Sequence, residues 1–261
     1  PVCQQGPVMS TNIIPTAFLF PAIGSFRLQA QETRYIVTRL GTDTVAIERY
    51  TRAPGKLEGD LVLRNPRVQT YHYSADLGPR GEIKTFRLMA RRADADPSAQ
   101  PRLTIVDTFG DSVAVLEVTR AGVRDTALSG KKSFRGRATA SFPTEPPAYG
   151  IYEQILSSSG LKGDSVSYAL VGPGGQVPSI ILRRRGADSV AFTSTFFPNW
   201  IEVARVDSRG RFLGVHSVAT TVKTMAAPYP ASGFEHSRSG GVPTQKAKVP
   251  PVPGAPPALA T

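Results

Sequence analysis

Short segments rich in Val, Ile, Thr, Phe and Tyr follow one another from Thr33 to about Lys223, separated by Gly, Asp, Pro and Ser. This pattern predicts antiparallel β-strands joined by tight turns, so that strands adjacent in the chain pair with each other. The expected strands are Thr33–Leu40, Thr44–Thr51, Asp60–Asn65, Arg67–Leu77, Glu82–Arg91, Arg102–Phe109, Ser112–Arg120, Val123–Leu128, Ser133–Ala140, Ser165–Val171, Val177–Arg184, Ser189–Thr195, Trp200–Val206 and Arg211–Thr221.

Apolar residues occupy both faces of these strands. In the second expected strand, Val45 and Ile47 lie on one face, and Ala46 and Tyr50 lie on the other. A flat sheet with one wet face would show a cleaner alternation, whereas a curved sheet with a covered concave side carries apolar groups on both faces. The sequence therefore predicts a mainly all-β fold, a curved antiparallel meander or half-open barrel.

One short helix is expected from Tyr149 to Ser159, after the proline-rich stretch 143–147. Tyr152, Ile155 and Leu156 fall on one helical stripe, and Gly160 is placed to cap the C-terminus. The helix is expected to cover an opening of the sheet or to separate two sets of strands.

Four regions follow from these features. They are an apolar N-terminal arm or signal-like segment (1–30), a first β region (31–142), a helix with a second β region (143–225), and a proline-rich extended tail (226–261). The two β regions form either halves of one sheet or two subdomains. The tail cannot bury a core, because eight of its 36 residues are proline, so we expect it to be extended unless a partner holds it.

The uncharged run from Ile13 to Ile23 resembles the core of a secretion signal, and residues 28–30 would serve as a small-residue cleavage site. No basic residue precedes the run, and the alternative is an apolar arm too short to span a bilayer as a helix. Cleavage after Ala30 would remove Cys3, the only cysteine. We expect an extracytoplasmic (periplasmic) protein, with a cytoplasmic location as the alternative.

Residues that carry chemistry are few. One cysteine and three histidines (His72, His216 and His236) exclude a disulfide framework, a thiolate zinc site and an iron–sulfur cluster. The chain has no nucleophile elbow or phosphate loop. His72 and His216 fall mid-strand and are expected to be structural, since a hydrolase would need a cleft joining one of them to a carboxylate. We expect no enzyme activity, no cofactor and no metal.

A weak repeat opens four of the expected strands with aspartate followed by Ser or Thr and Val. We expect these aspartates to accept backbone hydrogen bonds at turns rather than to bind a metal or transfer protons. They are Asp43, Asp111, Asp164 and Asp188.

The charge balance points to anionic partners, because 31 Lys and Arg face 20 Asp and Glu, a net charge of +11 over 261 residues. Basic clusters are either solvated strand ends or a docking face for anionic lipid or an acidic protein. Nucleic acid is disfavoured, since the chain shows neither a recognition helix nor an aromatic single-strand platform. The clusters are Lys131, Lys132, Arg135 and Arg137, then Arg183, Arg184 and Arg185, then Arg205, Arg209 and Arg211.

The densest aromatic patch comprises Phe192, Phe196, Phe197 and Trp200, the only tryptophan. We expect it to pack in the core near a strand crossing. The alternative is an anchor for a ligand pocket or a partner interface, where aromatic side chains contribute large area at low entropy cost. Phe196, Phe197 and Trp200 join the basic clusters as the candidate interaction surface.

Four segments carry a family resemblance: RYIVTRLG at 34–41, VAIERY at 45–50, PPAYGIYEQIL at 146–156 and VARVDSRGRFL at 203–213. They resemble bacterial envelope proteins of uncharacterised function that are similar to the half-open β-barrel superfamily of the periplasmic lipoprotein carriers. The resemblance implies a curved antiparallel sheet with a helix across its mouth, suited to hold an acyl chain. It transfers no ligand residue, and the proline-rich tail departs from it.

These features together favour a non-enzymatic, extracytoplasmic binding or scaffold protein, peripheral to the membrane. Its expected partners are other protein subunits of a membrane-associated assembly, photosynthetic complexes among them, and anionic or acyl lipid. The alternative is a soluble periplasmic carrier of a lipid or other apolar ligand.

Overall fold

The computed structural model describes residues 31–64, 67–96, 98–144, 147–159, 164–195, 198–199, 201–218 and 222–226. The signal-like segment 1–30, Gly160 and the tail beyond Ala226 lie outside the described residues. The strands are β1 (Glu32–Leu40), β2 (Asp43–Ala53), β3 (Lys56–Arg64), β4 (Val68–Leu77), β5 (Ile83–Arg92), β6 (Leu103–Phe109), β7 (Val113–Arg120), β8 (Val123–Arg124), β9 (Gly130–Ser133), β10 (Arg137–Ala140), β11 (Ser165–Val171), β12 (Ser179–Arg184), β13 (Ser189–Ser194), β14 (Ile201–Val206), β15 (Phe212–Ser217) and β16 (Val222–Ala226), with the single described helix α1 (Tyr149–Ser159) between β10 and β11.

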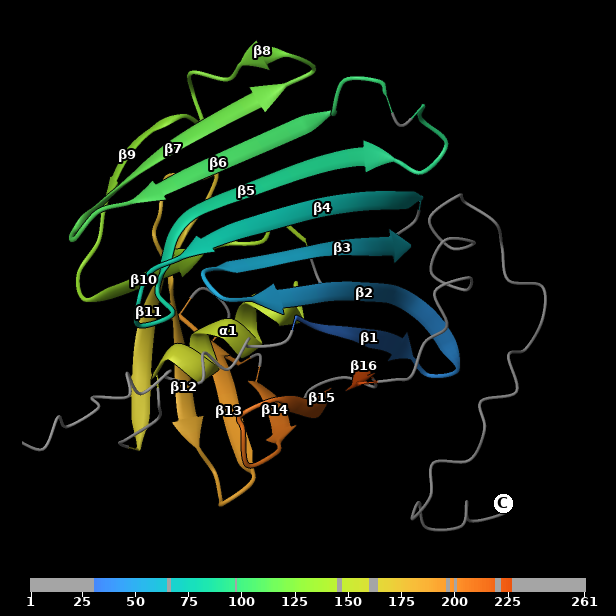
Figure 1. The fold of residues 1–261 in the computed structure, drawn as a ribbon, viewed down its shortest axis with the longest axis vertical. Coiled ribbons are helices and arrows are strands. Elements are labelled where there is room, and N and C mark those ends of the chain that lie inside the picture. The colour runs from blue at the N-terminus through green and yellow to red at the C-terminus, as the bar shows by residue number, and fades with distance from the viewer. Residues whose placement is uncertain are drawn as a thin grey trace, which may run out of the picture.

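The described strands form one strongly curved sheet in the order β10-β11-β12-β13-β14-β15-β16-β1-β2-β3-β4-β5-β6-β7-β8, with β9 also paired to β7 (Figure 1). The last strand pairs antiparallel with the first, with Val37 opposite Met225. Strands from both expected β regions therefore share one sheet. No pairing between β10 and β9 is found within the described ranges, so the sheet is curved but not closed into a barrel. The expected fold class, a curved antiparallel meander with one short helix, is confirmed.

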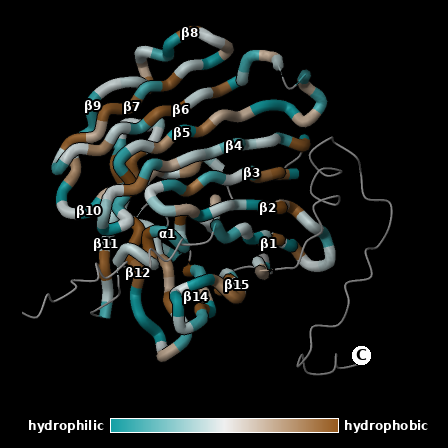
Figure 2. The backbone as a smooth tube through the Cα atoms, viewed as in Figure 1, coloured by the Kyte–Doolittle hydropathy of each residue, from teal (hydrophilic) through white to brown (hydrophobic). Residues whose placement is uncertain are grey.

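Helix α1 lies within the curve of the sheet (Figure 1). Its residues Tyr149, Ile151, Ile155 and Leu156 belong to the main core cluster, together with residues from the concave face of the strands. Removing this apolar surface from water is the main force that holds the helix against the sheet. Along most strands hydrophobic and hydrophilic residues alternate (Figure 2), as expected where one face meets a core.

The convex face carries a second, smaller cluster, made of Val37, Ile47 and Val62. Ala46 and Tyr50 from the opposite face of β2 lie in the main core. The prediction that both faces of these strands carry apolar groups is confirmed. We call the face towards α1 the inner face and the opposite one the outer face.

Four expected strands differ most in their extent. Asp60–Asn65 starts too late, since β3 begins at Lys56. Arg211–Thr221 contains only β15, and β16 begins beyond it at Val222 and was not expected. Ser133–Ala140 divides at Gly136, whose φ of +74° interrupts an extended chain, and the resulting β9 and β10 lie at opposite ends of the strand order. Val123–Leu128 shrinks to β8 because Asp125 Oδ1 accepts hydrogen bonds from the backbone N–H groups of the two residues at 127 and 128.

The expectation that every neighbouring pair is antiparallel is also wrong at one place. β10 and β11 run parallel, with Arg137 opposite Tyr168 and Ala140 opposite Val171. A parallel pair needs a crossover connection, and α1 lies in that crossover. The two strands that flank the helix in the chain, β10 and β11, are therefore neighbours in the sheet.

Candidate functional site

Helix α1 begins on a buried carboxylate from β2. Glu48 Oε2 accepts a hydrogen bond from the backbone N–H of Tyr149 at 2.7 Å, and its Oε1 accepts one from that of Gly150 at 2.9 Å. These are unsatisfied donors of the first helical turn, where a negative charge also meets the positive end of the helix dipole. Burial nevertheless raises the pKa of Glu48 to about 7, against the lowering effect of its hydrogen bonds. Glu48 therefore caps the helix from another element.

Tyr73 on β4 completes this cap. Its hydroxyl donates to Glu48 Oε1 at 2.5 Å. Its ring crosses Gly59, where a Cβ would stand 2.4 Å from Tyr73 Cζ, and its hydroxyl approaches Gly150, where a Cβ would stand 2.4 Å from Oη. Both positions need glycine, because a side chain would push the tyrosine away from the helix N-terminus.

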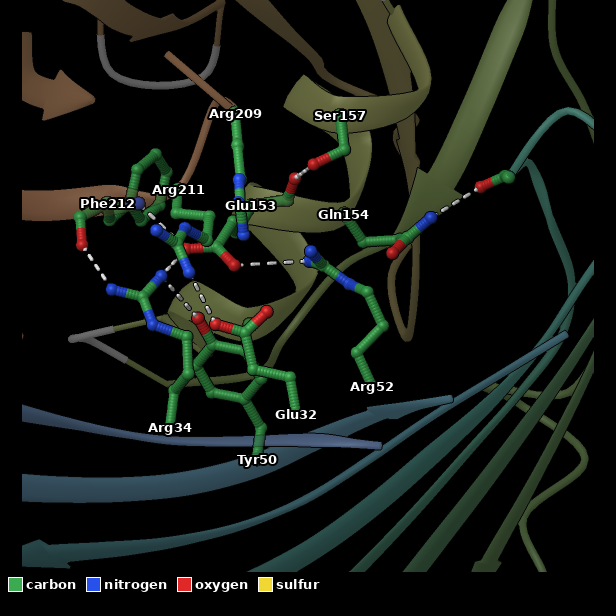
Figure 3. Close-up of polar contacts among 12 residues, drawn as sticks. Glu32, Arg34, Tyr50, Arg52, Glu153, Gln154, Ser157, Arg209, Arg211 and Phe212 are labelled. Atoms are coloured by element: carbon green, nitrogen blue, oxygen red, sulfur yellow. Dashed lines mark hydrogen bonds and ion pairs between the residues drawn. The ribbon is translucent and has the colours of Figure 1, made fainter. Parts of the chain in front are cut away.

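A second buried carboxylate, Glu153, pins the middle of the helix to the sheet (Figure 3). Its Oε2 forms an ion pair with Arg34 Nη1 and accepts the backbone N–H of Phe212 at 2.7 Å. Its Oε1 lies 3.3 Å from Arg52 Nη2. Arg34 also donates to the Phe212 carbonyl at 2.7 Å and to the Tyr50 hydroxyl at 3.3 Å. One side chain of α1 thus connects to β1, β2 and β15.

More arginines surround this cluster on the side of the β14–β15 turn. Figure 3 shows Arg209 and Arg211 beside Glu153. Arg211 donates from Nε to Asp207 Oδ2 at 2.5 Å and from Nη1 to Glu32 Oε1 at 2.8 Å. Here positive charge extends from the buried helix anchor to the protein surface.

The strand register brings the expected cluster Arg183–Arg185 to the same end of the sheet. Arg184 lies opposite Val190, and the preceding residue of β13, Ser189, lies opposite Arg205. Strands two apart are separated by about 10 Å. Arg205 is followed by the turn that carries Arg209 and Arg211, so two clusters distant in sequence meet. We call this set the arginine-rich end: Arg183, Arg184, Arg185, Arg205, Arg209 and Arg211.

Side chains of the arginine-rich end are mostly exposed, namely those of Arg183, Arg184, Arg185, Arg205 and Arg209. Arg205 lies 3.7 Å from Asp188, an exposed pair that contributes little to stability. The net positive charge of this end is therefore presented to solvent.

The remaining basic candidates lie elsewhere. Lys132 Nζ donates to the Gly174 carbonyl at 2.5 Å, beyond the C-terminal end of β11, whereas Arg183 lies opposite Ser165 at its N-terminal end. The seven residues of β11 span about 20 Å. The structure therefore separates Lys132 and its neighbour Lys131 from the arginine-rich end.

Arg137 takes a structural position. Its guanidinium lies 5.8 Å from the centroid of the Tyr168 ring and donates to the Tyr168 hydroxyl at 3.4 Å. That hydroxyl donates to the carbonyl of Ile155 in the last turns of α1 at 3.2 Å. Positive charge near a helix C-terminus is favourable. Arg135 is exposed.

Of the aromatic candidates, only Phe192 is described. It is 3% exposed, stacks on Tyr152 of α1 with ring centroids 5.3 Å apart, and meets Phe212 edge to face. Phe192 therefore packs in the core, as expected. Phe196, Phe197 and Trp200 lie outside the described residues.

The two expected strand histidines differ. His216 is exposed on β15. His72 Nδ1 lies 2.9 Å from Asp60 Oδ1 on the outer face, and this hydrogen bond raises the pKa of His72. A histidine and a carboxylate thus do meet within hydrogen-bond reach, although the pair Asp60 and His72 was not anticipated from the sequence.

The four repeat aspartates lie at the turns where they were expected, and the expected hydrogen bonds to their carboxylates stay a prediction. Asp43 begins β2, and the other three precede β7, β11 and β13; all four are exposed. No group of three or more His, Cys, Asp or Glu side chains placed to hold a metal ion occurs in the described part of the chain. No helix among the described residues has the length and apolar character needed to cross a membrane.

Glu48 and Glu153 are buried, hydrogen-bonded carboxylates that the sequence analysis did not single out. A signal for Glu48 was present, because it shares a strand face with Ala46 and Tyr50. Glu153 is a full turn from Tyr149 and falls within the apolar side of the helix. A carboxylate on an apolar face predicts a buried partner.

Comparison with known proteins gives little more. The sequence matches no protein-family model and no curated protein. Among solved structures, a DUF1089 family protein from Pseudomonas aeruginosa is similar with a TM-score of 0.44 and 12% identity, over 66% of this chain and 89% of that one. A β-barrel-like protein of the domain of unknown function DUF1849 from Brucella abortus has a TM-score of 0.40 and 9% identity, over 75% and 93%. At these values neither likeness bears on function, and the resemblance to lipoprotein carriers stays a prediction.

Proposed function

We propose that this chain is a non-enzymatic binding or scaffold protein that docks on an anionic membrane surface through the arginine-rich end, as an extracytoplasmic extrinsic subunit of a membrane-associated assembly. The observation that carries the proposal is the meeting of Arg183–Arg185 with Arg205 and Arg209 at one end of the sheet. Each basic residue held near an anionic surface contributes about 1 kcal/mol to binding, so the effect grows with the number that engage together.

The interior supports a role at the surface rather than in a ligand cavity. Tyr149, Ile151 and Ile155 of α1 pack into the main core on the concave side, where a carrier would hold its apolar ligand. Glu48 and Glu153 hold the helix in that place through their hydrogen bonds and ion pairs. These carboxylates have a structural task that explains their burial without catalysis.

Vesicle sedimentation tests the proposal. The full chain should bind vesicles that contain phosphatidylglycerol and should not bind vesicles of phosphatidylcholine alone. The triple variant R183Q/R184Q/R185Q should bind at least tenfold more weakly, since three charges near the surface are worth about 3 kcal/mol before solvent screening.

A matched control removes the same charge from the other end of the sheet. Arg64, Arg67 and Arg124 are exposed and lie away from the arginine-rich end. The variant R64Q/R67Q/R124Q should keep near-native binding although its net charge equals that of the first variant. Equal losses in both variants, or no preference for the anionic vesicles, would contradict the proposal.

A further inference from the structure

A polar hollow of about 310 Å³ opens on the outer face of β1, β2 and β3, opposite α1. It lies beside the outer cluster, since Tyr35 follows Val37 along the outer face of β1 and Arg49 follows Ile47 along the outer face of β2. Its volume is at the lower end of the range for small-molecule sites. The side chains that matter for its chemistry are Thr33, Tyr35, Arg49, Thr51, Glu58 and Asp60.

The charged groups at the hollow hold one another in place. Asp60 accepts from Arg49 Nη2 at 2.7 Å through Oδ2 and meets His72 Nδ1 at 2.9 Å through Oδ1. His72 Nε2 lies 3.6 Å from Glu58 Oε1, and Glu58 Oε2 lies 2.8 Å from Lys56 Nζ. Cations and carboxylates thus alternate across three strands. Such a network is preorganised, so a ligand would find its partners already oriented.

The charge of this network decides which ligand it suits. Arg49 and Lys56 balance Asp60 and Glu58, so the net charge is zero with a neutral His72 and one positive with a protonated one. A phosphate or a metal ion would gain little from a balanced array of this kind, in contrast to the arginine-rich end. A neutral ligand with many hydrogen-bonding groups would gain from it at several points.

Hydroxyl groups and one aromatic ring complete the hollow. Thr33 and Thr51 face each other across β1 and β2 with their Oγ1 atoms 2.9 Å apart. Tyr35 contributes a half-buried ring to the wall. Hydroxyls, carboxylate oxygens and guanidinium N–H groups match the vicinal hydroxyls of a sugar, which both donate and accept, and an aromatic ring can pack against the C–H face of a sugar ring.

We propose that the outer hollow binds a neutral saccharide of one or two rings through Thr51, Glu58 and the Arg49–Asp60 pair. The site uses other residues than the arginine-rich end, although Thr33 at its rim directly follows Glu32, which accepts a hydrogen bond from Arg211. It would give a membrane-docked protein a second contact, with glycan.

Amide-resolved NMR titration of the full chain with maltose, cellobiose and N,N′-diacetylchitobiose tests the proposal. At least one of the three should shift the backbone amides of residues 33–35, 49–51 and 58–60 in a saturable manner. Thr51→Val and Glu58→Gln should each weaken that binding about tenfold, the effect of losing one good hydrogen bond to the ligand.

Thr108→Val is the matched control, since Thr108 is an exposed threonine of β6 outside the hollow. It should leave the affinity unchanged. Unchanged melting temperatures would show that all three variants fold. Absence of saturable shifts with all three sugars, shifts confined to other strands, or equal affinities of the Thr51 and Thr108 variants would overturn the proposal. None of these outcomes depends on vesicle binding.

Discussion

Two sides of the interior treat a buried acid in opposite ways. On the helix side, Glu48 and Glu153 meet N–H donors at the start of α1 and arginines on β1 and β2. On the far side, Asp107 of β6 lies opposite Phe86 and Leu116, and neither of its oxygens has a hydrogen-bond partner in the described structure. Burial alone raises the pKa of Asp107 to about 7.

The difference shows that burial does not by itself assign a role to a carboxylate. A helix N-terminus and a guanidinium make a buried acid an anchor, because they replace the hydrogen bonds lost from water. Without such partners, burial of the ionised carboxylate costs free energy, and the carboxyl group lowers that cost by staying protonated. We therefore expect removal of the anchors to destabilise the fold and removal of Asp107 to stabilise it.

The largest expected effect comes from Glu153→Ala. It would leave Arg34, whose side chain is 15% exposed, without its carboxylate partner and would remove the hydrogen bond from the Phe212 N–H of β15 to the helix. Breaking one partner of a buried pair costs about 3–5 kcal/mol. Urea denaturation should show this loss of unfolding free energy, with a smaller loss in Glu153→Gln; a loss below about 1 kcal/mol would mean that the anchor is unimportant.

Asp107→Asn should have the opposite sign and a pH dependence. The folded state raises the pKa of Asp107 from 3.8 to about 7, so it binds the proton more tightly than the unfolded state does. Stability from this group is fully present below pH 4 and is lost as the pH rises to about 7. The variant lacks that loss and should be more stable than the wild type by about 4 kcal/mol at pH 8.

At pH 4 the two proteins should differ little, because Asp107 is then protonated in the folded state and close to half protonated in the unfolded state. Denaturation at both pH values measures the difference directly. A constant difference between pH 4 and pH 8 would show that Asp107 is ionised, and hence satisfied, in the folded protein.

Gly150→Ala tests the close approach at the helix N-terminus. The new Cβ would stand 2.4 Å from Tyr73 Oη and 2.9 Å from Tyr50 Cγ, so the helix would have to move away from Glu48. We expect a loss of about 2 kcal/mol, typical of overpacking, even though alanine favours helices. Gly175→Ala is the control, since a Cβ there meets nothing within 4 Å. Equal stability of Gly150→Ala and the wild type would place the helix further from the strands.

The smallest effect is expected from Tyr73→Phe, which removes only the hydroxyl that donates to Glu48. We expect a loss of about 1 kcal/mol in thermal or urea denaturation, the usual value of one hydrogen bond. The pKa of Glu48 should rise further, because one of the groups that lowers it is gone. NMR of the glutamate side chain measures this pKa, and a fall in it would contradict the anchor role.

Much of the architecture could be predicted from local signals. Glycine and aspartate marked most turns, and the apolar stripe of Tyr152, Ile155 and Leu156 located the helix. Local sequence signals did not predict structure that depends on contacts with residues distant in the sequence. The segment Lys56–Gly59 is mostly polar and contains a glycine, so it was not expected to be a strand. It nevertheless begins β3, where the missing side chain of Gly59 leaves room for the Tyr73 ring.

The candidate surface was half visible in the sequence. Each arginine cluster could be recognised by itself, but their meeting depends on the register of β12, β13 and β14, which periodicity does not supply. The separation of Lys132 from Arg183 arises in the same way. The outer hollow was invisible, since Arg49, Asp60 and His72 come from three strands.

Hydrogen exchange of the full chain bound to phosphatidylglycerol vesicles tests the proposed function most directly. Docking through the arginine-rich end predicts slower exchange in residues 183–189 and 205–211 on binding, with the strong protection of α1 (149–159) unchanged. Faster exchange in α1 with no change in those two segments would contradict it, because the interior rather than the surface would then have opened to the lipid.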